Sequence, residues 1–393
     1  MAQATWKVIG ASGFVGSSIV ARLAAEGLQV DAVEAPRLLT RTAEANQLIR
    51  EARQLDGIID TLAESFAGCE VVINASGLAA PDLEDLAPLL GANALLPAVI
   101  AIAAQRTGVS RVIHLSSAAV LGPVPVLSAE AEPQPFSTYS FSKALGEEVL
   151  LALRAFIEKT AAQGQAPGSE ASEFPAAPSH SPVAVAADHA VDICIIRATS
   201  VQGRGRRTTE AFAKIASSPL ASVAGRTPRR TPVSSNYALA EFVYRVASFT
   251  GPLPAIVMQP WEGVTTESVL IDAGRRRPLH LPAPLCRALV ATGYRVSEIL
   301  GDRLTGPVRR VEVMWFGQDI DDSWAQKNGL VPQARVSEVL RAAHSALGTR
   351  QDRKFENYTI GVPSFPSPSA SVSGSAGASC WAPKTRERAS ATE

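Results

Sequence analysis

Three side chains in the first half of the chain could together move a proton. Tyr139 and Lys143 are four residues apart, which places them on one face of a helix. A free phenol titrates at about 10, and a nearby ammonium group favours the phenolate and lowers that pKa. Tyr139 could therefore take a proton from a hydroxyl group. Ser117 could donate a hydrogen bond to the same oxygen and stabilise charge developing on it.

Three glycines near the start of the chain lie where a dinucleotide could bind. Gly10, Gly13 and Gly16 follow the apolar segment 6–9, which reads as a buried strand, and precede residues 17–26, which have helical spacing. Glycines between a strand and a helix allow a sharp turn and a close approach to a pyrophosphate, and the helix N-terminus offers free N–H groups. The sequence therefore predicts a dinucleotide cofactor held by six residues of this turn: Gly10, Ser12, Gly13, Phe14, Val15 and Gly16.

Charged residues after the second expected strand, residues 28–33, bear on the choice of cofactor. Glu34 stands at the C-terminal end of this strand, where an acid accepts hydrogen bonds from ribose hydroxyls and favours NAD. Arg37 or Arg41 could instead pair with a 2′-phosphate and favour NADP. The prediction is NAD, with NADP as the alternative.

Other residues at expected strand ends could also contact the cofactor. Asp56, in a short expected strand at 56–60, could lie near the adenine. Small residues after the strand at 71–74 let the backbone pass close to a ligand. Lys143 could hold the nicotinamide ribose, next to Tyr139. These further candidates for the cofactor site are Asp56, Asn74, Ala75, Ser76, Tyr139 and Lys143.

The elements that position these residues alternate between strand and helix over about 150 residues. Such alternation predicts an α/β fold with a Rossmann-type, doubly wound parallel sheet. Open parallel sheets bind ligands at the carboxyl ends of their strands, and the candidate residues fall at such ends. The segment 160–190 is rich in Ala, Pro and Ser and is interpreted as a flexible insertion, and residues 350–393 as a disordered tail.

Composition excludes several kinds of partner. The formal net charge is zero, with 37 basic and 37 acidic residues, so no overall basic field would attract nucleic acid or an anionic membrane. No signal peptide precedes the first expected strand, and no apolar run is judged long enough to span a bilayer. The cysteines, which lack metal-ligand spacing, are Cys69, Cys194, Cys286 and Cys380. We expect a cytoplasmic protein with a small-molecule substrate, no metal, no nucleic acid and no membrane partner.

Taken together, these motifs resemble the extended short-chain dehydrogenase/reductase family, in its NAD-dependent epimerase/dehydratase branch. The resemblance rests on residues 10–16, 116–122 and 139–147. It implies a Rossmann domain at 1–197 that binds a nicotinamide cofactor, and a smaller C-terminal substrate domain at 198–349 from which some segments return to the sheet. It also implies that the catalytic residues are Ser117, Tyr139 and Lys143, and that the protein could form a homodimer.

Departures from the family pattern bear on the substrate. Dehydratases carry an acidic pair where this chain has Ala118 and Ala119, so dehydration is not expected. Sugar epimerases carry an asparagine where this chain has Ser200. Arg229 could match an arginine that grips a substrate phosphate, or it could lie on a solvated loop. The candidate substrate contacts are Ser117, Ser200 and Arg229.

Several functions fit this set of residues. The leading hypothesis is an NAD(P)-dependent oxidoreductase or epimerase that acts on a hydroxyl or keto group of a nucleotide sugar or related polyol. The alternatives are an NADPH-dependent ketone or aldehyde reductase, a hydroxysteroid-type dehydrogenase, and a non-catalytic NAD(P)-binding protein. The intact set of Ser117, Tyr139 and Lys143 argues against the last.

Overall fold

The structure, a computed structural model, describes residues 5–79, 85–162, 190–301 and 304–352. Residues 1–351 form one compact unit, and a second unit, residues 352–393, lies almost wholly outside the described part. The predicted insertion at 160–190 and the predicted tail at 350–393 also fall largely outside the described residues. Both therefore stay predictions.

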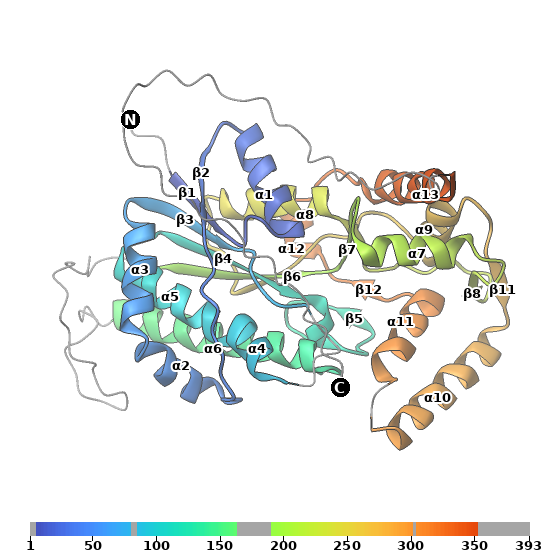
Figure 1. Ribbon diagram of the computed structural model, residues 1–393, viewed down its shortest axis with the longest axis horizontal. Coiled ribbons are helices and arrows are strands. Elements are labelled where there is room, and N and C mark those ends of the chain that lie inside the picture. Colours follow the sequence, from blue (N-terminus) through green and yellow to red (C-terminus); the bar gives the residue numbers. More distant parts are fainter. Residues whose placement is uncertain (1–4, 80–84, 163–189, 302–303, 353–393) are drawn as a thin grey trace, which may run out of the picture. The chain divides into compact units, whose positions relative to one another are not determined.

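A six-stranded parallel sheet forms the centre of residues 1–351 (Figure 1). Its order is β10-β6-β4-β3-β1-β2, and every neighbouring pair of strands is parallel. The strands are β1 (Thr5–Ile9), β2 (Gln29–Val33), β3 (Cys69–Asn74), β4 (Arg111–Ser117), β6 (Asp192–Ala198) and β10 (Ile256–Met258). The strand order reverses direction between β1 and β3, which is where open α/β sheets bind ligands. The predicted doubly wound parallel sheet is confirmed.

Helices cover both faces of the sheet because successive strand side chains point to opposite sides. Val72 and Ile193 face a core formed with α2 (Ala45–Arg53), α3 (Asp56–Phe66), α5 (Leu96–Arg106) and α6 (Thr138–Ala162). Ile73 and Ile196 face the other core, formed with α1 (Phe14–Ala25) and α8 (Asn236–Ala247). In Figure 1 these two groups of helices lie on opposite sides of the sheet.

One predicted strand is wrong. Residues 56–60, expected to be a short strand, are the first turns of α3. The buried residues of this segment are Ile59, Leu62, Ala63 and Phe66, whose spacing of three and four residues is helical. The short segment 56–60 suggested a strand, whereas the longer segment 56–66 has the period of a helix. The edge strand on this side of the sheet is therefore β2.

The chain from Ala87 to Arg106 is one continuous helix. It comprises α4 (Ala87–Leu90), the π-helical turn η1 (Gly91–Leu95) and α5. By length and hydropathy it could span a membrane, contrary to the prediction that no apolar run is long enough. However, 83% of its apolar window is buried inside the protein, as expected for a core helix.

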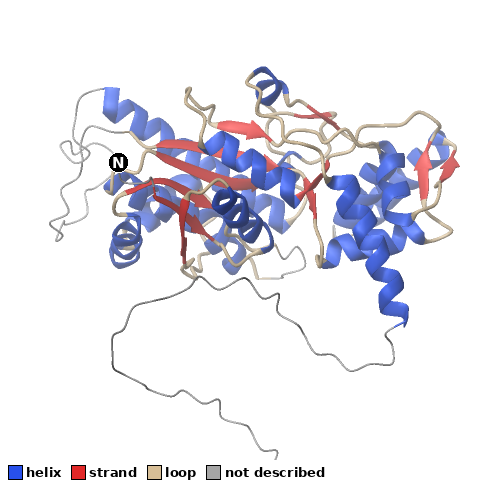
Figure 2. Cartoon of the chain, turned by 90° about the horizontal axis from the view of Figure 1, so that it is seen from above, coloured by secondary structure: helices blue, strands red, loops and turns tan. Residues whose placement is uncertain are grey.

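Residues after β6 divide between the central sheet and a second, smaller core. Strand β10 joins the sheet and α8 packs against α1. The smaller core lies among helices beside the sheet (Figure 2). The remaining elements are η2 (Ala118–Leu121), β5 (Val126–Leu127), β7 (Ser200–Gln202), α7 (Arg207–Ser217), β8 (Ser222–Ala224), β9 (Val233–Ser235), α9 (Thr266–Gly274), β11 (Leu279–Leu281), α10 (Ala283–Ile299), α11 (Thr305–Phe316), β12 (Asp319–Ile320), α12 (Ser323–Lys327) and α13 (Val336–Asp352). The boundary at residue 197 stays a prediction.

Candidate active site

The turn between β1 and α1 is pressed against the end of β3. Gly10 has a φ of +79°, and a Cβ atom there would lie 2.7 Å from the backbone nitrogen of Ser76. A Cβ atom on Gly16 would lie 2.0 Å from the carbonyl oxygen of Gly10. Helix α1 starts at Phe14, so the N–H groups of its first turn point toward the carboxyl edge of the sheet. This turn has the form of an anion-binding helix N-terminus.

The residues predicted to discriminate between NAD and NADP lie on the same edge. Ile9 pairs with Val33 of β2 on one side and with Asn74 of β3 on the other, so Glu34 follows a strand next to the glycine turn. The side chains of Glu34 and Arg37 are both exposed. The acid and the arginine are thus both free to meet a ribose or its phosphate, and the two alternatives stay open.

The Asn74 side chain is engaged by protein groups. Its Oδ1 accepts hydrogen bonds from the Ser76 N–H at 3.1 Å and from the Ser76 hydroxyl at 2.5 Å. Its Nδ2 lies 3.0 Å from Nδ1 of His114, a buried residue of β4. Burial and the nearby Lys143 ammonium hold the pKa of His114 well below its usual range. The neutral imidazole and the Asn74 amide therefore fix the end of β3, from which Ala75 and Ser76 continue toward the glycine turn.

Ser117, Tyr139 and Lys143 meet at the carboxyl end of β4. Ser117 is the last residue of β4, and its hydroxyl accepts a hydrogen bond from the Ala119 N–H at 3.2 Å. Tyr139 and Lys143 lie one turn apart on α6. Burial raises the pKa of Tyr139, and a side-chain hydrogen bond with Ser117 acts in the opposite direction. The phenol and the serine hydroxyl are thus close enough to share one substrate oxygen.

Lys143 is buried and turned toward the backbone beneath the site. Its Nζ donates a hydrogen bond to the carbonyl oxygen of Leu115 at 2.9 Å. Burial lowers its pKa to about 8, although the charge of Glu147 acts to raise it. A Cβ atom on Gly77 would lie 3.0 Å from Nζ and 2.8 Å from Oδ1 of Asn93. Because Gly77 has no side chain, no Cβ atom crowds the Lys143 ammonium group at this position.

Sequence reasoning missed the role of Asn93. This residue is fully buried in the π-helical turn, and its side chain bonds both the N–H and the carbonyl of Leu78 and the Ser142 hydroxyl. It thereby ties the loop after β3 to the helix that carries Tyr139 and Lys143. A polar residue inside an apolar helix, well before the polar last two residues Gln105 and Arg106, was the signal that could have identified it.

Sequence reasoning also missed Arg206, which precedes α7. Its guanidinium carbon lies 4.8 Å from the ring centroid of Phe14, at the start of α1, and it donates a hydrogen bond to the carbonyl of Val201. The positive charge of Arg206 also acts to lower the pKa of Tyr139. Arg206 thus stands between the glycine turn and the phenol. Among Arg204, Arg206 and Arg207, no sequence signal distinguished it.

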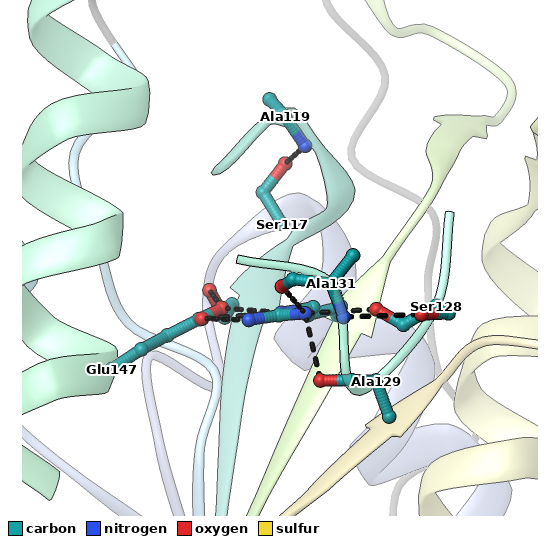
Figure 3. Close-up of polar contacts among 8 residues, drawn as sticks. Ser117, Ala119, Ser128, Ala129, Ala131 and Glu147 are labelled. Carbon is teal, nitrogen blue, oxygen red and sulfur yellow. Dashed lines mark hydrogen bonds and ion pairs between the residues drawn. The ribbon is translucent and has the colours of Figure 1, made fainter. Parts of the chain in front are cut away.

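A buried ion pair lies directly below Ser117 (Figure 3). Glu147 of α6 pairs with Arg197 of β6 at 2.8 Å, and both side chains are almost fully buried. The second carboxylate oxygen of Glu147 accepts a hydrogen bond from Ser116 at 2.5 Å. Arg197 also donates to three carbonyl oxygens of one loop, those of Ser128, Ala129 and Ala131. The pair therefore connects the sheet, the helix of Tyr139 and the loop between them.

Three predicted site residues are not joined to this group. Asp56 forms an ion pair with Arg106 at 3.0 Å, at the end of α5 that leads into the start of β4. Ser200 is exposed and accepts a hydrogen bond from Gln202. Arg229 is exposed, and among the described residues its side chain has no polar contact with Ser117, Tyr139 or Lys143. The substrate roles of Ser200 and Arg229 stay predictions.

Comparison with known proteins assigns the N-terminal part of this arrangement. Residues 6–159 match the model of the NAD dependent epimerase/dehydratase family. The match covers the N-terminal part of the chain, and residues 160–393 lie outside it. The matched segment contains the glycine turn, Ser117, Tyr139 and Lys143, so the family domain coincides with the site described above.

A curated relative and solved structures extend the comparison. A 4-hydroxy-2-methyl-3-oxo-4-farnesyl-3,4-dihydroquinoline-1-oxide ketoreductase from Stigmatella aurantiaca is 32% identical over 154 residues, which are 37% of this chain and 44% of the ketoreductase. The match thus spans less than half of that relative. MoeE5 in complex with UDP-glucuronic acid and NAD aligns with a TM-score of 0.54 and 18% identity, covering 88% of this chain and all of MoeE5. UDP-glucuronic acid 4-epimerase from Bacillus cereus in complex with NAD aligns with a TM-score of 0.55 and 15% identity, covering 88% of this chain and 99% of the epimerase. These structures share the fold of this chain.

Proposed function

We propose that this protein is an NAD(P)-dependent oxidoreductase or epimerase that acts on a hydroxyl or keto group of a small molecule. One observation carries the proposal. The glycine turn, the Ser117 hydroxyl and the Tyr139 phenol all lie at the carboxyl edge of one parallel sheet. A dinucleotide at the turn and a substrate oxygen at the phenol would then be neighbours.

The protein groups have complementary tasks in this chemistry. When bound, the nicotinamide ring supplies hydride transfer. Tyr139 would exchange a proton with the substrate oxygen, and this proton together with the hydride transferred at carbon accounts for the interconversion of a hydroxyl and a carbonyl group. Ser117 donates a hydrogen bond to that oxygen as its charge changes. The Lys143 ammonium and the Gly77 backbone lie beside each other, and they would bind the ribose that carries the nicotinamide ring.

The relatives suggest two classes of substrate. MoeE5 and the Bacillus cereus epimerase have each been solved with UDP-glucuronic acid and NAD, which supports a nucleotide sugar and a cofactor that is recycled in place. The ketoreductase match supports a second candidate, a reductase of a ketone with exchangeable cofactor. Its residue identity is higher than that of the aligned structures, which is the specific reason to keep this candidate.

The first experiment identifies the cofactor. The purified chain is denatured, released nucleotide is identified by mass spectrometry, and binding of NADH and NADPH is measured by calorimetry. Stoichiometric NAD in the released fraction supports an epimerase and Glu34 as the ribose acid. An empty protein that prefers NADPH supports a reductase and Arg37 or Arg41. Binding of neither would overturn the proposal.

The second experiment tests chemistry. UDP-glucose, UDP-glucuronic acid and a panel of ketones are offered to the wild-type chain and to Tyr139→Phe. Loss of general acid–base catalysis costs about 10²–10⁴-fold in rate, so the variant is expected to bind cofactor normally and turn over at least about a hundredfold more slowly. Cofactor binding without turnover of any substrate would favour a non-catalytic NAD(P)-binding protein. A homodimer and a cytoplasmic location stay predictions.

A further inference from the structure

Helix α10 presents an apolar stripe to solvent. Its outward side chains Leu285, Leu289, Val296, Ile299 and Leu300 are between 40 and 83% exposed. Leu285, Leu289, Val296 and Leu300 are spaced by four, seven and four residues, so they lie along one face of the helix. In Figure 1, α10 lies beyond α11 on the side away from the central sheet. A continuous apolar stripe of this kind is unusual on a protein surface unless something binds to it.

The neighbouring face of α10 is fixed against α11, which leaves the stripe in solvent. Cys286 and Val290 are buried there. Tyr294 donates a hydrogen bond to Glu312 at 2.6 Å, and the hydroxyls of Ser297 and Thr305 are 2.8 Å apart. Because these contacts span the length of the helix, α10 cannot rotate to bury the stripe without breaking them.

The segment that carries the stripe is basic. Residues 275–301 contain five arginines and one acidic residue, Glu298, which gives this segment a net charge of +4 in a chain whose total is zero. All five arginines are exposed: Arg275, Arg276, Arg277, Arg287 and Arg295. None of the five forms an ion pair within the described part of the chain, and the guanidinium carbon of Arg287 lies 5.9 Å from the ring centroid of Phe316 in α11. Although the whole chain has no net charge, the segment 275–301 is basic and contains an amphipathic helix.

We propose that this face of α10, with the turn at Arg275–Arg277, docks on the surface of an anionic lipid bilayer. Exposed leucine and isoleucine side chains would enter the headgroup region while the arginines meet the anionic headgroups. Two copies of the same face would instead bring the exposed arginines of two chains together, which disfavours a second copy as the occupant. The surface is separate from the glycine turn and from Tyr139. It is linked to the site through α11, whose Arg309 donates to the carbonyl of Gly122 at 3.0 Å.

The test is co-sedimentation of the full chain with vesicles of phosphatidylcholine alone and of phosphatidylcholine with an equal part of phosphatidylserine. Binding to the anionic vesicles is expected, with little binding to the neutral ones. Each arginine near an anionic surface contributes about 1 kcal/mol, or about fivefold in affinity. The double variant R276Q/R277Q is therefore expected to bind about 25-fold more weakly, and binding should weaken as salt is raised.

A second pair of variants tests whether vesicle binding depends on the apolar stripe of α10 or on any exposed apolar side chain. Leu289→Glu with Ile299→Glu should abolish vesicle binding, whereas Leu39→Glu should not, although Leu39 is 70% exposed. Thermal unfolding of each variant checks that it is folded. Absence of binding to anionic vesicles would overturn the proposal. Sedimentation velocity provides the other decisive outcome, since self-association that disappears in the Leu289→Glu variant would assign the face to a second copy instead.

Discussion

At the scale of single residues, the positive charge that acts on Tyr139 is not the one that the sequence suggested. The sequence suggested that Lys143 lowers the pKa of the phenol. In the structure the Lys143 Nζ bonds the Leu115 carbonyl, and the cation whose charge acts on Tyr139 is Arg206. Burial still raises the pKa of Tyr139 above its usual range, so the cofactor-free protein holds a neutral phenol at neutral pH. This form can give a proton to a carbonyl oxygen.

The first prediction concerns Arg206. Replacement by Met removes a positive charge from the environment of Tyr139, so the pKa of the phenol should move further upward. The ultraviolet titration curve of Tyr139→Phe is subtracted from that of the wild-type chain, which leaves the titration of the Tyr139 phenol. The same subtraction between Arg206→Met and Arg206→Met/Tyr139→Phe gives the pKa of the phenol without the guanidinium. Arg206→Lys, which keeps the charge, should restore part of the effect. An unchanged titration in Arg206→Met would show that the guanidinium stacked on Phe14 has no electrostatic role at the phenol.

The second prediction concerns Lys143 and pH. Burial lowers the folded-state pKa of Lys143 from 10.5 to about 8, so between these values the unfolded chain binds more protons than the folded one. The Lys143 contribution to the free energy of unfolding should thus rise with pH across this window, by up to about 3 kcal/mol. Chemical denaturation at several pH values gives the free energy of unfolding of the wild type and of Lys143→Met. The difference between the two is the Lys143 contribution, because the effects of the other titrating groups cancel in it. A difference independent of pH would contradict the prediction.

At the scale of elements, the glycine turn is a contact between three chain segments. The end of β1, the start of α1 and the residues after β3 meet at Gly10, where the φ of +79° and the 2.7 Å approach of a Cβ atom to Ser76 both require glycine. The function proposed for this turn therefore depends on packing that brings two strand ends together. Substitutions here should change stability and cofactor affinity at once.

The third prediction tests this contact with two Gly→Ala variants. In Gly16→Ala the new Cβ atom would lie 2.0 Å from the Gly10 carbonyl oxygen, so backbone must move, at a cost of about 1–3 kcal/mol in unfolding free energy. Dinucleotide affinity should fall as well. In Gly57→Ala no atom lies within 4 Å of the new Cβ, and because the site is helical the variant should be neutral or up to about 1 kcal/mol more stable. Denaturation curves and calorimetry would compare them, and equal effects would refute the steric argument.

At the scale of the whole molecule, the Glu147–Arg197 pair connects parts that are distant in sequence. The two side chains are 50 residues apart and come from α6 and β6, and the pair also holds the loop that contains Ser128 and Ala131 (Figure 3). A buried pair is weak evidence for net stability, but loss of one partner leaves a buried charge alone. The position of α6, and hence of Tyr139, depends on this connection.

The fourth prediction measures that dependence. Glu147→Gln should lower the free energy of unfolding by about 3–5 kcal/mol, because the Arg197 guanidinium would stay buried without its counter-charge. Glu158→Gln is the matched control, since Glu158 lies on the same helix in an exposed pair with Arg154 and should change stability by less than about 0.5 kcal/mol. Urea denaturation compares the two. A Glu147→Gln effect as small as that of the control would mean that water or another group compensates Arg197.

Local sequence determined much of this protein, because periodicity and turn chemistry act within short windows. The apolar segment before Gly10, the glycine spacing and the i, i+4 pair of Tyr139 and Lys143 sufficed to predict the parallel sheet, the glycine turn and the helix of the acid/base pair. The expected strand at 56–60 failed because two apolar side chains, Ile58 and Ile59, are too few to separate a strand from a helix, and only a longer window shows the helical period.

Tertiary structure alone decided which residues meet across the chain. Arg206 is 67 residues from Tyr139. Only the folded structure distinguishes Arg206 from Arg204 and Arg207 as the arginine whose charge acts on the phenol. The pattern of α10 predicts an amphipathic helix, but a pattern does not state which face is covered. Packing on α11 buried the Cys286 side and left the Leu289 side in solvent. Such choices depend on contacts between distant segments, and those contacts exist only once the chain has folded.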